Sequence, residues 1–121
     1  TYGVQAKGAS SVYISFKQKK IVNHESLSTF AEGLATRSTY EYSFKIMQDY
    51  VDDVFLVSDD EIKNAIRLIY KYTENIAEGA GAASLAGLIK YKEKFQGKKV
   101  VCVLTGGNLQ KEVFQEIVNS N

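Results

Sequence analysis

The sequence contains no proline and has only one cysteine and one histidine. At average usage a chain of this length would hold roughly six prolines, so its turns must rely on glycine, asparagine, aspartate and serine. The single cysteine, Cys102, excludes an intramolecular disulfide, and its apolar neighbours predict a small core residue of an intracellular protein. Because His24 is far from Cys102 in the sequence, neither a zinc-ligand set nor a cysteine–histidine pair is available. We expect His24 to be a solvated surface residue.

An excess of charge of either sign is also missing, since 15 basic residues face 14 acidic ones and the net charge is +1. This balance predicts no nucleic-acid partner and no binding to an anionic membrane. The densest basic cluster, residues 17–20, is interpreted as a solvated helix end. No apolar run is long enough to cross a bilayer, and no basic-then-apolar leader opens the chain. We therefore expect a cytoplasmic protein.

Strand-like and helix-like patterns alternate along the chain, which predicts an α/β fold with an open, mostly parallel sheet and flanking helices. The predicted strands are residues 2–6, 54–57 and 100–104, and the last of these is an unbroken apolar run typical of a strand buried on both faces. The predicted helices cover residues 9–17, 40–50, a stretch after Ser58, a small-residue stretch around 75–89, and 109–118. Between residues 21 and 38 we expect a long loop with one helical turn.

The helix after Ser58 has the strongest local pattern. Ser58 and Glu61 have the spacing of a capping box, in which the two side chains bond the free amides at a helix start. The expected apolar face of this helix is Ile62, Ala65, Ile66, Ile69 and Tyr70. In the helix over 40–50, the expected apolar face is Phe44, Met47, Tyr50 and Val51.

Length and organisation predict a single α/β unit covering residues 1–121. The chain begins at Thr1 rather than Met and opens directly on a strand, which suggests a piece of a longer protein.

The candidate site lies where the apolar run 100–104 meets Thr105, Gly106, Gly107 and Asn108. Ligands of open α/β sheets bind beyond the carboxyl ends of the strands, and this segment offers a hydroxyl, bare backbone and a predicted helix start. Thr105 is either a helix N-cap or a ligand-binding residue. Glu78, next to a Gly/Ala run, is either a helix N-terminal carboxylate or a buried functional one.

Two clusters of acidic residues are interpreted as turn and capping residues rather than as metal ligands. Asp52 and Asp53, and residues 58–61, stand at an expected helix end and helix start. Turn and capping roles account for these positions, so we predict no metal site there.

Five segments together resemble the C-terminal part of the catalytic region of the threonine dehydratases, a fold-type-II, pyridoxal-phosphate-dependent family that also contains serine racemase. In order they are residues 3–9 (GVQAKGA), 30–36 (FAEGLAT), 50–54 (YVDDV), 78–83 (EGAGAA) and 105–108 (TGGN). The resemblance covers nearly the whole chain. It implies that the chain is part of the large domain of such an enzyme.

The resemblance implies a threonine ammonia-lyase, which converts L-threonine to 2-oxobutanoate and ammonia by β-elimination of water, with pyridoxal 5′-phosphate as cofactor. It places Thr105 against the pyridine nitrogen, Gly33 and Gly106 beside the cofactor, and Glu78 near the ring. The complete enzyme is then expected to be a homo-oligomer.

The family's Schiff-base lysine and its Gly-rich phosphate loop belong upstream, and neither motif occurs in this sequence. We therefore expect no catalytic residue within these 121 residues and an inactive chain. Gln5 and Ser11 replace carboxylates that help hold a divalent cation in serine racemase, which leaves a cation site in doubt.

Two alternatives remain open. Within the same family, a serine dehydratase or serine racemase would act on L-serine, and the preference between the two substrates rests on one methyl group, worth about 1–3 kcal/mol. Outside it, a stand-alone α/β module could bind an anion at the helix start after Thr105, Gly106 and Gly107.

Overall fold

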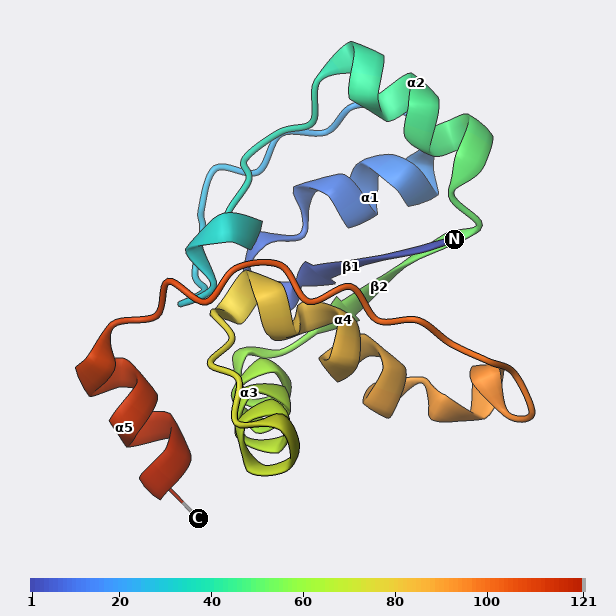
Figure 1. Cartoon of the computed structure of the whole chain (residues 1–121). Helices are drawn as coiled ribbons and strands as arrows, with labels where there is room; N and C mark the ends of the chain where they lie inside the picture. The colour runs from blue at the N-terminus through green and yellow to red at the C-terminus, as the bar shows by residue number, and fades with distance from the viewer. Residues whose placement is uncertain (121) are drawn as a thin grey trace.

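The computed structural model describes residues 1–120, which form a small parallel sheet between two pairs of helices. Strands β1 (Tyr2–Ala6) and β2 (Asp53–Val57) pair in parallel, with Tyr2 opposite Asp53 and Ala6 opposite Val57. Helices α1 (Ser11–Gln18) and α2 (Glu41–Tyr50) lie on one side of the sheet, and α3 (Asp59–Thr73) and α4 (Gly79–Lys90) lie on the other (Figure 1). The predicted α/β class is confirmed.

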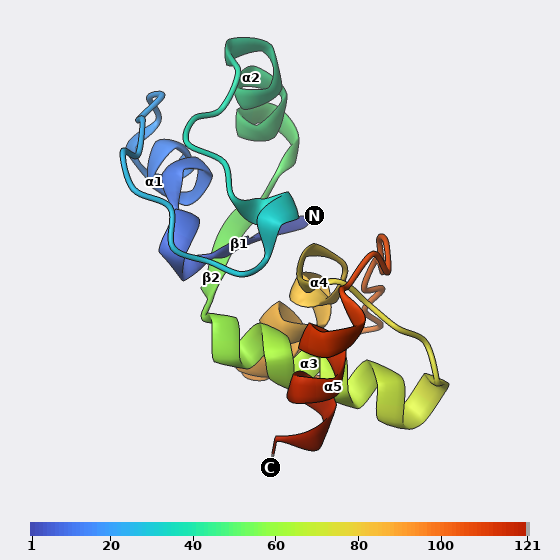
Figure 2. The ribbon, with the colours of Figure 1, turned by 90° about the vertical axis from the view of Figure 1, so that its left-hand side faces the viewer.

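The remaining elements are short or terminal. Within residues 1–120, three 3₁₀ turns, η1 (Lys7–Ala9), η2 (Glu32–Leu34) and η3 (Lys92–Phe95), lie in the connections. Helix α5 (Lys111–Asn119) packs beside α3, as the view turned by 90° shows (Figure 2). The loop before α2 contains a single helical turn, η2, as the sequence predicts. No helix within residues 1–120 combines the length and apolar character that crossing a bilayer requires.

The main core lies between the sheet, α3 and α4. Helix α3 buries Ile62, Ala65, Ile66 and Ile69, while Tyr70 is 37% exposed. The capping box is present, because Ser58 Oγ accepts from the Glu61 N–H at 3.2 Å and Glu61 Oε2 accepts from the Ser58 N–H at 2.7 Å. The facing side chains come from β1, β2, α4 and α5 and include Ala6, Val57, Ala82, Ala86 and Ile117. Small residues on α4 allow its close approach to the sheet.

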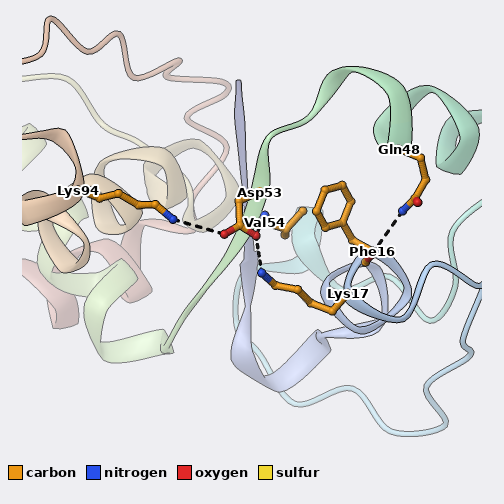
Figure 3. A network of polar contacts seen from close by, with 6 residues as sticks. All are labelled: Phe16, Lys17, Gln48, Asp53, Val54 and Lys94. Carbon is orange, nitrogen blue, oxygen red and sulfur yellow. Dashed lines mark hydrogen bonds and ion pairs between the residues drawn. The ribbon is translucent and has the colours of Figure 1, made fainter.

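At the start of β2, Asp53 joins elements from the two sides of the sheet (Figure 3). Its carboxylate accepts hydrogen bonds from Lys17 Nζ of α1 at 2.5 Å and from Lys94 Nζ of η3 at 3.5 Å. Partial burial opposes ionisation of Asp53, but the bonds from Lys17 and the Val54 N–H outweigh it, so its pKa lies below the ordinary value. The sequence predicts that Asp53 stands in a turn. In the structure it is the first residue of β2 and forms ion pairs with Lys17 and Lys94.

The predicted strand over residues 100–104 is wrong for the described part of the chain. Residues 98–110 run as extended backbone without strand pairing, passing across α4 (Figure 1). Ser84 Oγ of α4 donates to the Val103 carbonyl at 2.9 Å, while Val101 and Val103 are 89% and 65% exposed. A strand needs a neighbouring backbone to bond, and residues 1–120 place none beside this segment. Cys102 is consequently half-buried against Ser84 rather than in a core, and this burial raises the pKa of its thiol.

Three smaller expectations also need correction. Tyr50 does not share the inner face of α2 but is 75% exposed, because it stands on the last turn while Phe44 and Met47 point inward. Helix α1 begins at Ser11 rather than Ala9, since a 3₁₀ turn occupies residues 7–9. The last helix begins at Lys111 with Gln110 as its N-cap, so Leu109 precedes it and Thr105 is not a helix cap.

Candidate functional site

The first turn of α4 brings the four predicted site residues together. A Cβ at Gly33 would stand 2.8 Å from Ala80 Cβ, which shows how closely η2 lies on this turn. The extended segment lies on the same turn, since a Cβ at Gly81 would stand 2.7 Å from the carbonyl oxygens of both Thr105 and Gly106. Segments that are distant in the sequence therefore converge here, and glycine permits each contact because it has no side chain.

Glu78 is the N-cap residue of α4 and lies between these two segments. Its own side chain does not cap the helix. Instead, Oε2 accepts from the Asn108 N–H at 3.2 Å, and the Glu78 N–H donates to the Gly106 carbonyl at 3.3 Å. The carboxylate also lies against Gly106, whose φ of +63° is in the left-handed region that favours glycine. Glu78 is half-buried, so the sequence-based expectation of scarce solvent holds only in part.

A pocket of about 500 Å³ opens beside this carboxylate. Glu32, Gly33, Glu78, Gly79 and Ala80 form one side of it, and residues 29–30 and 108–110 with Val113 form the rest. Of the predicted site residues, Gly33 and Glu78 line the pocket, whereas Thr105 and Gly106 lie behind Glu78 on the extended segment. Thr105 is exposed there.

The pocket is polar, because Thr29, Glu32, Asn108 and Gln110 line it together with Glu78, whereas the Thr105 hydroxyl lies outside it. In residues 1–120 the Oε1 atom of Glu78 has no hydrogen-bond donor, and it lies 2.8 Å from the Cβ position of Gly106 and 3.9 Å from that of Gly33. The exposed hydroxyl of Thr105 can donate or accept. These polar groups can bind a small polar ligand, while the negative charges of Glu78 and Glu32 disfavour an isolated anion in the pocket.

The other candidates from the sequence are not part of this site. His24 is half-buried in the loop before α2, where its backbone bonds to Arg37, rather than fully solvated. Within residues 1–120 no three histidine, cysteine, aspartate or glutamate side chains gather as a metal site would require. The cluster at residues 17–20 is exposed at the end of α1, as predicted.

Gln5 and Ser11 form a neutral network next to η2. The Gln5 amide donates to Thr36 Oγ1 at 3.2 Å and its oxygen accepts from the Tyr13 N–H at 2.8 Å. Ser11 Oγ donates to the Thr36 carbonyl at 2.7 Å. Gln5 and Ser11 are 5% and 0% exposed. The hydrogen-bonding groups of Gln5 and Ser11, at the two positions where a cation site was in doubt, are therefore already used within the protein.

Sequence reasoning missed the pocket wall contributed by Thr29, Phe30 and Gln110. It also gave Asp59 only a capping role. In the structure the Asp59 carboxylate accepts from Thr29 Oγ1 at 2.6 Å and from the Phe30 N–H at 3.0 Å. No local sequence pattern could predict these hydrogen bonds, because the partners are about thirty positions apart.

Comparison with known proteins agrees with the resemblance. A family model described as "Pyridoxal-phosphate dependent enzyme" matches residues 1–106. The biosynthetic L-threonine dehydratase of Pasteurella multocida is 39% identical over 88% of this chain, and the L-threonine ammonia-lyase of Geobacter sulfurreducens is 36% identical over 96%. The chain spans only 21% and 29% of the length of these two relatives.

Solved structures give the same result. The processed form of threonine deaminase isoform 2 from Solanum lycopersicum superposes with a TM-score of 0.90 at 31% identity, covering 96% of this chain and 32% of that one. Maize serine racemase superposes with a TM-score of 0.85 at 26% identity, covering 95% of this chain and 37% of that one.

Proposed function

Because the chain belongs to the family of pyridoxal-phosphate dependent enzymes, we propose that it is part of a threonine ammonia-lyase, which converts L-threonine to 2-oxobutanoate and ammonia. In this proposal the chain is a C-terminal portion of the catalytic region, and the lysine that carries the cofactor and the phosphate-binding loop lie elsewhere in the complete protein. The chain is then inactive by itself. The names of its relatives support threonine as the substrate.

The observation that carries the proposal is the convergence of Gly33, Glu78, Thr105 and Gly106 on the first turn of α4. The chemistry of this donor set fits pyridoxal 5′-phosphate. The exposed Thr105 hydroxyl can donate to a neutral ring nitrogen, and the Oε1 atom of Glu78 can accept from a polar substituent. At Gly33 the backbone has no side chain that would keep a flat ring away.

When bound, the cofactor supplies an electron sink for the electron pair left on the substrate's α-carbon after deprotonation. Thr105 would hold the ring nitrogen and leave it uncharged, because a hydroxyl is neutral whereas a carboxylate would favour the protonated form. Glu78 accepts from the Asn108 N–H, and this bond would keep its carboxylate in one position if the ring binds beside it.

The test uses the complete protein that contains this chain. Its visible absorbance would reveal the bound cofactor, and 2-oxo acid formation would be followed with L-threonine and with L-serine. We expect a cofactor band, 2-oxobutanoate from threonine, and lower turnover after Thr105→Ala or Glu78→Ala. A protein without the band and without oxo acid would contradict the proposal.

The same assay separates the related activities. Pyruvate formed faster than 2-oxobutanoate would indicate a serine dehydratase, and D-serine formed from L-serine would indicate a racemase, as the structural similarity to maize serine racemase requires us to consider.

A further inference from the structure

The segment that carries Gly33 is fastened to the fold at its beginning by Asp59. This residue opens α3, and its half-buried carboxylate binds both the Thr29 hydroxyl and the Phe30 N–H. Bonds to a charged acceptor are the stronger kind. The carboxylate therefore holds two successive residues of the loop with its two oxygens.

Thr29 connects Asp59 to the backbone that leads to Gly33. Its hydroxyl donates to Asp59 Oδ1 and at the same time accepts from the Ala31 N–H at 3.2 Å. Ala31 is 1% exposed and packs against Gly79, where a Cβ would stand 2.8 Å from Ala31 Cβ. Gly33 follows two residues later, in contact with Ala80. The order of contacts is thus Asp59, Thr29, Ala31 and then the α4 turn.

We infer that Asp59 is a positioning residue that holds residues 29–33 against the first turn of α4 and so fixes Gly33 in the site. The inference rests on the proposed function, since it concerns where the backbone at Gly33 stands relative to the cofactor. Asp59 acts through Thr29 and Phe30 and touches no reacting atom. Its role at the start of α3 is separate, because Ser58 and Glu61 already form the capping box.

The chain offers a matched control. Asp60 is also acidic, stands next to Asp59 in the first turn of α3, and is exposed. Replacing either residue with alanine removes one negative charge from the same helix end. Only Asp59→Ala removes the bonds to Thr29 and Phe30.

The experiment is made in the complete protein with Asp59→Ala, Asp60→Ala, Thr29→Val and Thr29→Ser. Cofactor affinity is measured by titration of the visible band and its spectrum. We expect Asp59→Ala and Thr29→Val to weaken cofactor binding by roughly tenfold or more, with Asp60→Ala near the wild type and Thr29→Ser restoring binding. Unchanged affinity and spectrum in Asp59→Ala, or equal losses in Asp59→Ala and Asp60→Ala, would overturn the inference. If Asp59→Ala does not fold, amide hydrogen exchange at Phe30 and Ala31 in Thr29→Val and Thr29→Ser decides, because Thr29 also lines the pocket and its effect on cofactor affinity could be direct.

Amide hydrogen exchange separates this inference from the proposed function. We expect faster exchange at Phe30 and Ala31 in Asp59→Ala than in Asp60→Ala, with or without cofactor. If the wild-type protein binds no cofactor, the proposed function fails, and equal exchange rates in the two variants would then overturn the fastening role as well.

Discussion

Gly106 lies directly against the carboxylate of Glu78, so that a Cβ at position 106 would stand 2.8 Å from both Cδ and Oε1 of Glu78. This contact joins the extended segment to the start of α4, and it predicts that Gly106→Ala is costly for two reasons. A left-handed φ costs a non-glycine residue about 1 kcal/mol, and the added methyl group displaces Glu78. Gly97 has a similar φ of +73° with nothing within 4 Å of its Cβ position, so Gly97→Ala isolates the first cost.

We therefore expect Gly97→Ala to lower the free energy of unfolding by about 1 kcal/mol, and Gly106→Ala to lower it by about 1–3 kcal/mol more. Denaturant unfolding of both variants would measure the difference. Equal losses would show that the Glu78 carboxylate moves away without cost.

The ion pair between Lys17 and Asp53 predicts a dependence of stability on pH. The pKa of Asp53 is lower in the folded state than in the unfolded state. The stabilisation that its ionised carboxylate gives the fold is therefore fully present above the unfolded-state pKa, and it is lost as the pH falls through the folded-state pKa. The hydrogen bond to Asp53 raises the pKa of Lys17. The stabilisation by the charged Lys17 is therefore fully present below the unfolded-state pKa of lysine, and it is lost as the pH rises through the folded-state pKa.

Asp53→Asn should therefore lower stability at neutral pH by at most about 1 kcal/mol, since the pair is partly exposed to solvent. In acid below the folded pKa, the difference from the wild type should vanish. Unfolding free energies measured from acid to neutral pH would check this, with Asp49→Asn on the exposed side of α2 as control. A difference that persists in strong acid would contradict the ion-pair explanation.

The capping box predicts a local effect at the start of α3. Ser58→Ala removes the acceptor for the Glu61 N–H and should cost about 1 kcal/mol. Ser58→Thr keeps a hydroxyl and should stay close to the wild type. The midpoint of denaturant unfolding would rank the two, and a neutral Ser58→Ala would mean that water replaces the cap.

Two valines test the structural difference between β2 and residues 100–104. Val57 is 0% exposed, so Val57→Ala should cost about 2 kcal/mol through lost burial and a cavity. Val101 is 89% exposed, so Val101→Ala should change stability by less than about 0.5 kcal/mol. Comparable losses at the two positions, in unfolding of the complete protein, would show that other parts of it cover Val101.

What the sequence predicted well was local. The apolar face from Ile62 to Ile69 and the Ser58 cap follow from spacings of three and four residues, and tertiary packing confirms them. The predicted strand around Val101 depends instead on which backbone stands beside it, and residues 1–120 supply none. Propensity alone does not determine that neighbour.

The candidate site divides in the same way. Glu78 and Gly33 could be selected from motifs, and the structure places them on one pocket. The bond between Asp59 and Thr29 depends on the packing of α3 against a loop thirty residues earlier. A position in the first turn of a helix accounts for an aspartate by itself, so the sequence around Asp59 carries no sign of its bonds to Thr29 and Phe30.

The bare backbone of residues 100–104 has a consequence for handling this polypeptide. The segment is rich in β-branched side chains, carries no charge and contains no proline, and most of its side chains face solvent. Such a window is a template for intermolecular strand pairing and fibril growth. Lys98 and Lys99 stand at one end as charged gatekeepers, whereas the other end opens onto Thr105 and two glycines. Aggregation of this chain at high concentration should therefore begin at residues 100–104, and a lysine introduced at Val103 should delay it.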